Sequence, residues 1–159
     1  SKPLLKDVER ELLGYEGIVL FEIKSEPSLV TEYYPNPKEY ADIIYNHVKD
    51  SPLKSNYIYM SFDPEILNEL HTLMSKERYV LLEYNPFKCF SKLKESLKFT
   101  PHAFGLNYKI ITPKFVNKSH KENIEVFAWT VNEIEMSNEL IKIGVDAIIT
   151  DYPNLIKHE

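Results

Sequence analysis

The stretch IEVFAWTVNEIEMSNELIKIGVDAIITDYP, residues 124–153, decides the fold, because it predicts a strand, a helix and a second strand in close succession. Residues 125–130 form a short aromatic and β-branched run, which favours a buried strand over a helix. Residues 145–150 are a second apolar run. The crossover between the two runs is long enough for them to pair in parallel.

The helix of this βαβ unit has a predicted start and a predicted end. Asn132 is a suitable N-cap, and Glu135 three residues later completes a capping box. Gly144 suits the left-handed conformation that ends a helix. Between these ends an apolar stripe is expected to face a sheet, and its members are Met136, Leu140, Ile141 and Ile143.

The same alternation of strand and helix extends over the chain and predicts an α/β fold with a parallel sheet. A length of 159 residues suits a single domain, residues 1–159. The six predicted strands are 18–24, 57–62, 79–83, 103–106, 125–130 and 145–150. Helices are predicted at 4–13, 37–49, 64–74, 88–97 and 132–143, with a further helix beginning at Pro113.

Polar and aromatic residues at the carboxyl ends of these strands are the candidates for a site, because ligands of parallel α/β folds bind there. Trp129 ends one strand and is a binding candidate, with simple packing as the alternative. Phe62 ends another strand beside Ser61, and both could face the site, although packing explains Phe62 equally well.

Glu22 and Lys24 share one face of the strand at 18–24 with aliphatic side chains. A buried carboxylate is costly unless it is paired or binds a cation. One interpretation is that the two residues pair with each other. The other is that Glu22 is an oxygen ligand of Mg²⁺ or Ca²⁺ and that Lys24 contacts a phosphate.

Composition limits the functional classes. The net charge of −5 argues against a nucleic-acid partner, and a lysine cluster at residues 88–98 is interpreted as a solvated helix face. No run approaches the roughly 20 apolar residues of a transmembrane helix. A single cysteine, Cys89, favours a reducing, cytoplasmic setting. Only four glycines are present, and none forms a phosphate loop, which disfavours a doubly wound nucleotide-binding domain.

Four segments, taken in order, resemble the later strands of the glycerophosphodiester phosphodiesterase family. They are FEIK at 21–24, SFDPEIL at 61–67, WTVN at 129–132 and GVDAIITDYP at 144–153. The resemblance implies a (β/α)₈ barrel of which this chain holds about six parallel strands, the third to the eighth. It also implies metal-dependent hydrolysis of glycerophosphodiesters to glycerol 3-phosphate and an alcohol.

By this resemblance Glu22 is a metal ligand, Lys24 lies in the phosphate site, and Phe62 and Trp129 line the substrate pocket, with Asn107 a further substrate contact. The family's first two strands, which carry a His-Arg-Gly start, a Glu-x-Asp pair and a second histidine, have no counterpart here. A whole barrel takes about 250 residues. We therefore expect that this chain alone does not turn over substrate.

Three explanations for the shortfall stay open from the sequence. The chain is a fragment of a full enzyme, or it associates with a separate amino-terminal piece that completes the barrel, or it is a shortened relative that binds a phosphate ligand without catalysis. Unpaired edges of an open barrel favour the first two, because exposed strand edges invite pairing. Tyr33 and Tyr34, in a proline-rich loop after the first strand, are expected to influence substrate choice.

Overall fold

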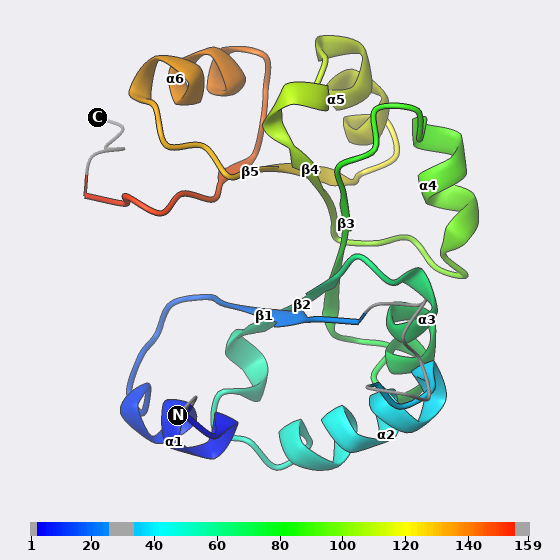
Figure 1. Cartoon of the computed structure of the whole chain (residues 1–159), viewed down its shortest axis with the longest axis vertical. Coiled ribbons are helices and arrows are strands. Elements are labelled where there is room, and N and C mark those ends of the chain that lie inside the picture. Colours follow the sequence, from blue (N-terminus) through cyan, green and yellow to red (C-terminus); the bar gives the residue numbers. More distant parts are fainter. Residues whose placement is uncertain (1–2, 26–33, 155–159) are drawn as a thin grey trace. The chain divides into compact units, whose positions relative to one another are not determined.

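The computed structural model describes residues 3–25 and 34–154, and the predicted loop residue Tyr33 lies outside the described residues. The chain divides into two compact units, Ser1–Tyr79 and Val80–Glu159 (Figure 1). Across the described ranges, no helix combines the length and the apolar character needed to cross a membrane.

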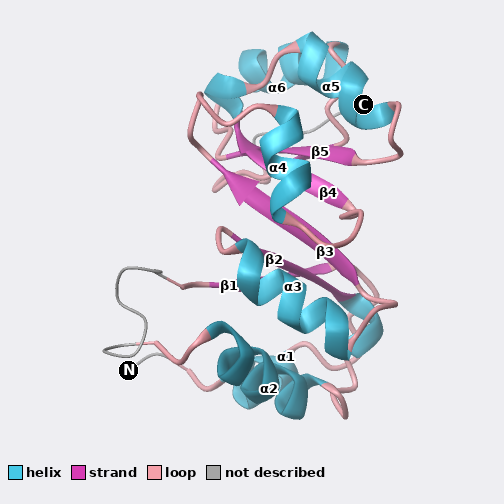
Figure 2. Cartoon of the chain, turned by 90° about the vertical axis from the view of Figure 1, so that its right-hand side faces the viewer, coloured by secondary structure: helices cyan, strands magenta, loops and turns pink. Residues whose placement is uncertain are grey.

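The described residues of the first unit form a pair of parallel strands and three α-helices, and Figure 2 shows these elements. In β1 and β2, Val19 lies opposite Tyr57 and Ile23 lies opposite Ser61. The elements are α1 (Leu5–Glu11), β1 (Val19–Ile23), α2 (Pro37–Val48), the 3-10 turn η2 (Lys54–Asn56), β2 (Tyr57–Ser61) and α3 (Pro64–Leu73). A third strand, β3 (Arg78–Glu83), begins in this unit and continues in the second.

Two of these helices begin as their sequences predict. Asp63 accepts a hydrogen bond from the backbone N–H of Glu65 at 3.0 Å, and Pro64 takes the first helical position. Asn36 caps α2 in the same way, through the backbone N–H of Glu39 at 3.0 Å. The helices bury their apolar faces, and the buried residues include Ala41, Ile44 and Val48 of α2 and Ile66, Leu67 and Leu70 of α3.

The second unit continues the βα alternation from β3. Its strands pair in parallel in the order of the sequence, with Val80 opposite Ala103, Ala103 opposite Glu125 and Phe127 opposite Ala147. The elements are α4 (Phe90–Ser96), β4 (Ala103–Asn107), the 3-10 turn η3 (Tyr108–Ile110), α5 (Pro113–His120), β5 (Glu125–Trp129), α6 (Ile134–Lys142) and β6 (Ala147–Ile148). The predicted α/β class with parallel strands is confirmed.

A compact apolar core joins α5, β5 and α6. Its buried members are Val116, Val126, Ala128, Val131, Leu140 and Val145. Met136 and Ile143 of the predicted helical stripe pack against it, whereas Ile141 is exposed. Gly144 has φ +93°, so the left-handed helix end is confirmed.

Two local predictions in the quoted stretch are wrong. Asn132 does not cap α6, which begins at Ile134 after Glu133 without a side-chain cap. The side chain of Asn132 binds the chain beyond β6 instead, so a long-range partner replaces the local one. The last strand is also shorter than the apolar run predicts, because regular pairing is confined to Ala147–Ile148.

Candidate active site at the carboxyl ends of the strands

In the first unit, three predicted site residues lie on one face of the β1–β2 pair. Glu22 is opposite Met60 in the register. Lys24 and Phe62 each follow by one residue the last opposed pair, Ile23 and Ser61. Since side chains alternate along strands, Glu22, Lys24 and Phe62 share a face at the carboxyl end. Phe62 is 37% exposed there, so it is not simply part of the core.

Glu22 and Lys24 form the ion pair that one of the two interpretations predicts. The Lys24 Nζ donates to Glu22 Oε1 at 2.8 Å, and the side chains are 76% and 28% exposed. Glu22 is thus not a buried carboxylate in need of a cation. An exposed pair of this kind contributes about 0–1 kcal/mol. An arriving anion therefore meets a lysine that is held only weakly.

The backbone that carries Lys24 is fixed from three directions. The Ser61 hydroxyl, fully buried, donates to the Ile23 carbonyl at 2.8 Å, so the expectation that Ser61 faces the site is wrong. The Tyr40 hydroxyl donates to the Lys24 carbonyl at 3.4 Å. The Ser25 hydroxyl donates to Asp63 Oδ2 at 3.1 Å, which ties the end of β1 to the cap of α3.

In the second unit, Asn107 and Trp129 are direct partners in the register of β4 and β5. They are therefore neighbours at the carboxyl ends of the two strands. The Asn107 Oδ1 accepts a hydrogen bond from the Lys109 backbone N–H at 3.1 Å and so caps the η3 turn. The carbonyl oxygen of this side chain is therefore used to stabilise the turn. Its NH₂ group is the part that can donate to a ligand.

Gly105 of β4 was not among the predicted site residues, although it shapes the neighbourhood of Trp129. A Cβ at this position would lie 2.6 Å from Leu82 Cδ2, 3.1 Å from Val80 Cγ1 and 3.7 Å from Trp129 Cδ1. Such contacts are too close for the neighbours to stay in place. A glycine inside a strand signals a close approach of this kind.

The end of β6 is tied to the segment after β5 by Asn132. Its Oδ1 accepts hydrogen bonds from the Asp151 backbone N–H at 3.0 Å and from the Thr150 hydroxyl at 3.1 Å. Its Nδ2 donates to Asp151 Oδ2 at 2.9 Å. These three bonds hold the two segments that the sequence places at strand ends, residues 129–132 and 150–153, against each other.

Glu83, at the carboxyl end of β3, is a second residue that sequence reasoning missed. It is 5% exposed, and its Oε1 accepts from the backbone N–H groups of Tyr84 at 2.9 Å and Asn85 at 2.8 Å. Its Oε2 lies 2.7 Å from Lys88 Nζ. The signal was a charged residue that closes an apolar run just before Asn85 and Pro86. Its role is to hold the loop after β3.

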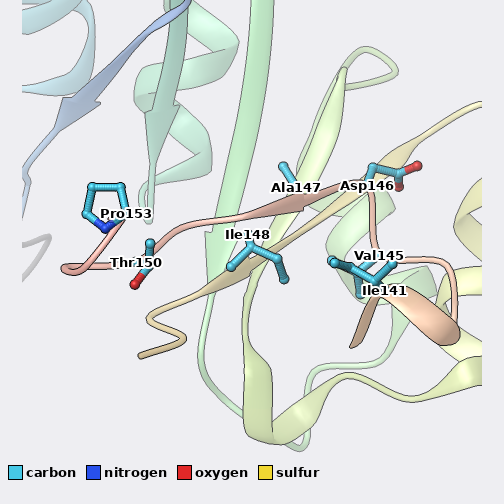
Figure 3. A pocket seen from close by; sticks show the side chains of 7 residues that line it. All are labelled: Ile141, Val145, Asp146, Ala147, Ile148, Thr150 and Pro153. Atoms are coloured by element: carbon cyan, nitrogen blue, oxygen red, sulfur yellow. The ribbon is translucent and has the colours of Figure 1, made fainter. Parts of the chain in front are cut away.

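A shallow hollow of about 260 Å³ runs along β6 (Figure 3). Ile148 points to the side on which Ile141 and Val145 lie, and Thr150 and Pro153 close the carboxyl end. Within the described part of the second unit, β6 pairs with β5 alone, so its other edge is open. A similar hollow of about 240 Å³ lies in the first unit between α1 and β1, lined in part by Leu5, Leu20 and Glu22.

The described residues alone do not fit a divalent cation. No group of three or more His, Cys, Asp or Glu side chains in residues 3–25 and 34–154 is arranged to hold a metal ion. Glu22 supplies one carboxylate, already paired with Lys24. His102, the histidine nearest to a strand, precedes β4 and lies 3.5 Å from Glu125 at the amino end, away from the candidate site.

Parallel strands that alternate with helices, with charged and aromatic side chains gathered at their carboxyl ends, define part of a (β/α)₈ barrel. The chain belongs to the glycerophosphoryl diester phosphodiesterase family, whose profile matches residues 3–155. This confirms the resemblance that the four sequence segments indicate.

Individual relatives agree with this assignment. The Bacillus subtilis (strain 168) protein YhdW, provisionally named a glycerophosphodiester phosphodiesterase, is 25% identical over 148 residues, which are 89% of this chain and 57% of YhdW. A Silicibacter pomeroyi DSS-3 structure, provisionally named for the same family, has a TM-score of 0.82 at 24% identity, over 96% of this chain and 54% of its own.

An Oleispira antarctica phosphodiesterase in complex with the product sn-glycerol-3-phosphate has a TM-score of 0.81 at 18% identity, over 97% of this chain and 59% of its own. At these identities the two structures establish the shared fold. This chain spans about half the length of the relatives it matches.

Proposed function

We propose that this chain supplies part of the active site of a phosphoric diester hydrolase that converts glycerophosphodiesters to glycerol 3-phosphate and an alcohol. The observation that carries the proposal is the placement of Lys24, Glu22 and Phe62 on one face at the carboxyl end of β1 and β2. Family membership supports it. The complex of the Oleispira antarctica phosphodiesterase with sn-glycerol-3-phosphate supports the substrate class.

Each proposed role follows from the chemistry of the side chain. Lys24 offers a mobile ammonium group with three donors, which suits the non-bridging oxygens of a phosphodiester. Phe62 in the first unit and Trp129 in the second each offer an apolar face for the carbon atoms of a ligand. Asn107 can donate from its amide nitrogen to a hydroxyl while its carbonyl oxygen keeps the bond to Lys109.

A divalent cation, Mg²⁺ or Ca²⁺, belongs to this proposal, with Glu22 as one oxygen ligand. Such ions take six or more oxygen ligands, so one carboxylate is insufficient. The remaining protein ligands would come from outside the described residues. When bound, the cation would supply charge neutralisation at the phosphate.

The same reasoning predicts that the chain by itself is inactive. Cleavage of a phosphodiester needs a base on one side and an acid for the leaving alkoxide on the other. The described strand ends offer no histidine for either task. The open edge of β6 and the hollow beside it give a separate amino-terminal piece a place to pair.

The test is an assay of glycerol 3-phosphate release from glycerophosphocholine, with Mg²⁺ or Ca²⁺ present. We expect no turnover by the pure chain. Turnover should appear when a piece that carries the first two strands of a family member is added, and Lys24→Gln should abolish it. The matched control is Lys38→Gln, an exposed lysine of α2. Metal-dependent hydrolysis by the pure chain would refute the proposal of an incomplete site.

A second function, binding of a phosphate ligand without catalysis, is favoured by the Glu22–Lys24 pair, which leaves Glu22 committed to a lysine instead of a metal. Phosphorus NMR with sn-glycerol 3-phosphate separates the two. Binding that Lys24→Gln removes, without turnover in any reconstitution, would favour the binding module. The exposed and solitary Cys89 supports the expected reducing, cytoplasmic setting for either function.

A further inference from the structure

Positive charge is concentrated in one part of the sequence. Residues 84–121 contain eight lysines and one acidic residue, Glu95, which gives this segment a net charge of +7 in a chain of −5. The remaining residues therefore carry −12. The lysines, all of them exposed, are Lys88, Lys92, Lys94, Lys98, Lys109, Lys114, Lys118 and Lys121. Two of these charges are paired with acidic residues that flank the segment, Lys88 with Glu83 and Lys94 with Glu122. The other lysines still outnumber the acidic residues of the segment, and such a charge asymmetry indicates an anionic partner.

Helices α4 and α5, which are neighbours in the second unit (Figure 2), carry Lys92, Lys94, Lys114 and Lys118. Lys94 of α4 pairs with Glu122, just beyond α5. Lys118 of α5 places its Nζ 4.7 Å from the ring centroid of Phe90 in α4. Lys114 and Lys118 are four residues apart and share a face of α5. The two helices thus present their positive charge together.

Two exposed aromatic side chains belong to the loop after β3, which leads through Lys88 into α4. Phe87 is 86% exposed and Tyr84 is 65% exposed. The loop is held in place by the bonds of Glu83 and by Asn85, whose Oδ1 accepts from the Phe87 backbone N–H at 2.9 Å. The exposure of Phe87 is therefore a property of an ordered loop.

We propose that this lysine surface, formed by α4, α5 and the loop with Tyr84 and Phe87, docks on the face of an anionic lipid bilayer. Lysines near such a face are attracted by its negative potential. Aromatic side chains beside them favour the boundary between headgroups and acyl chains. The rest of the chain carries −12 and would repel a flexible polyanion, such as a nucleic acid, that contacts several sides of the protein. A flat bilayer contacts the lysine surface alone and is repelled less.

In the docked state Phe87 would enter the headgroup layer from the loop after β3, beside the amino-terminal end of α4. The inference itself rests on charge and exposure and does not need the proposed hydrolysis.

The test measures co-flotation of the purified chain with vesicles. One set is phosphatidylcholine alone, and the other is phosphatidylcholine mixed with phosphatidylserine. We expect binding to the mixed vesicles that weakens when the salt concentration rises, because salt screens exposed charges. A lysine near the surface contributes about a fivefold increase in partitioning. The triple variant Lys92→Gln, Lys114→Gln, Lys121→Gln should lower binding by more than tenfold.

Matched controls separate a specific surface from overall charge. The triple variant Lys38→Gln, Lys76→Gln, Lys142→Gln removes the same charge from exposed positions elsewhere and should leave binding within about twofold. Phe87→Ser should reduce binding, whereas Leu13→Ser, at another exposed apolar position, should not. Circular dichroism checks that each variant is folded.

Three results would overturn the proposal. The first is equal loss of binding in both triple variants, and the second is equal binding to both kinds of vesicle. The third is binding to single-stranded DNA, with the same lysine dependence, in the absence of binding to vesicles, which would assign the surface to nucleic acid.

Discussion

Removal of one hydroxyl group, in Tyr57→Phe, tests how the first helix is fixed to its unit. Glu9 of α1 is buried, and its Oε1 accepts hydrogen bonds from the hydroxyls of Tyr57 at 2.6 Å and Ser51 at 2.7 Å. Its Oε2 lies 3.1 Å from His47 Nε2. The carboxylate therefore joins α1 to α2, to β2 and to the turn between them.

The size of the effect follows from these contacts. A hydrogen bond to a charged group contributes about 1.5–3 kcal/mol, and loss of the Tyr57 hydroxyl leaves a buried carboxylate oxygen with Ser51 as its remaining partner. For a chain of 150–250 residues, 1 kcal/mol shifts the melting temperature by about 2–4 °C. We expect Tyr57→Phe to lower it by roughly 3–12 °C.

The pH dependence adds a second signature. Burial tends to raise the pKa of Glu9, but hydrogen bonds from Tyr57, Ser51 and His47 outweigh it, and the pKa lies below its ordinary value of 4.5. The stabilisation is thus present above pH 4.5 and is lost as the pH falls through the lower pKa of the folded state. Burial and the bond to Glu9 raise the pKa of Tyr57 to about 12. The stabilisation that the Tyr57 hydroxyl provides is complete below pH 10 and is lost as the pH rises through about 12.

The matched control lies on the same strand. Tyr59 is fully buried, and its hydroxyl has no hydrogen-bond partner among the described residues. Tyr59→Phe removes the same atom without breaking a bond, so we expect unchanged or slightly higher stability. Thermal melts followed by circular dichroism between pH 3 and pH 11 provide the data. Equal destabilisation by the two substitutions would show that the Glu9 bonds do not carry the effect.

Three smaller changes test other parts of the fold. Gly144→Ala should cost about 1 kcal/mol in a thermal melt, because φ is +93° there, whereas Asn138→Ala in the same helix should not destabilise. Asn132→Ala should speed hydrogen exchange of the Asp151 amide, whose acceptor it removes. Asn117→Ala, at an exposed position of α5, should leave that rate unchanged. Asp63→Ala should lower the stability of the first unit by about 1 kcal/mol through loss of the α3 cap, and a cap-preserving Asp63→Asn should recover most of it.

The sequence predicted those elements that local rules govern. The start of α3 at Asp63 and Pro64 and the end of α6 at Gly144 depend on nearby residues, and the alternation of strands and helices depends on hydrophobic periodicity. The same rules failed at Asn132, where a capping box was chemically possible. The Asn132 side chain instead accepts hydrogen bonds from the backbone N–H of Asp151, nineteen residues away, and from the hydroxyl of Thr150, eighteen residues away.

For the candidate site, the sequence predicted which residues share a face but not which hydrogen bonds their side chains make. The alternation rule placed Glu22 and Lys24 on one face, and the register of β1 and β2 adds Phe62 to it. It could not show that Ser61 turns away to bind the Ile23 carbonyl, because that bond joins two strands 38 residues apart. Nor could it show that the carbonyl oxygen of Asn107 is used by its own turn.

These contacts separate the strand-end residues by what they have left for a ligand. The side-chain oxygens of Asn132, Glu83 and Asn107 accept hydrogen bonds from the chain itself. Lys24 is 76% exposed and holds one weak partner, Glu22. Substitution of Asn132 or Glu83 should therefore act on ligand binding through loop geometry and stability together. Substitution of Lys24 should act on phosphate binding alone, and for this reason it is the sharpest test of function that the chain offers.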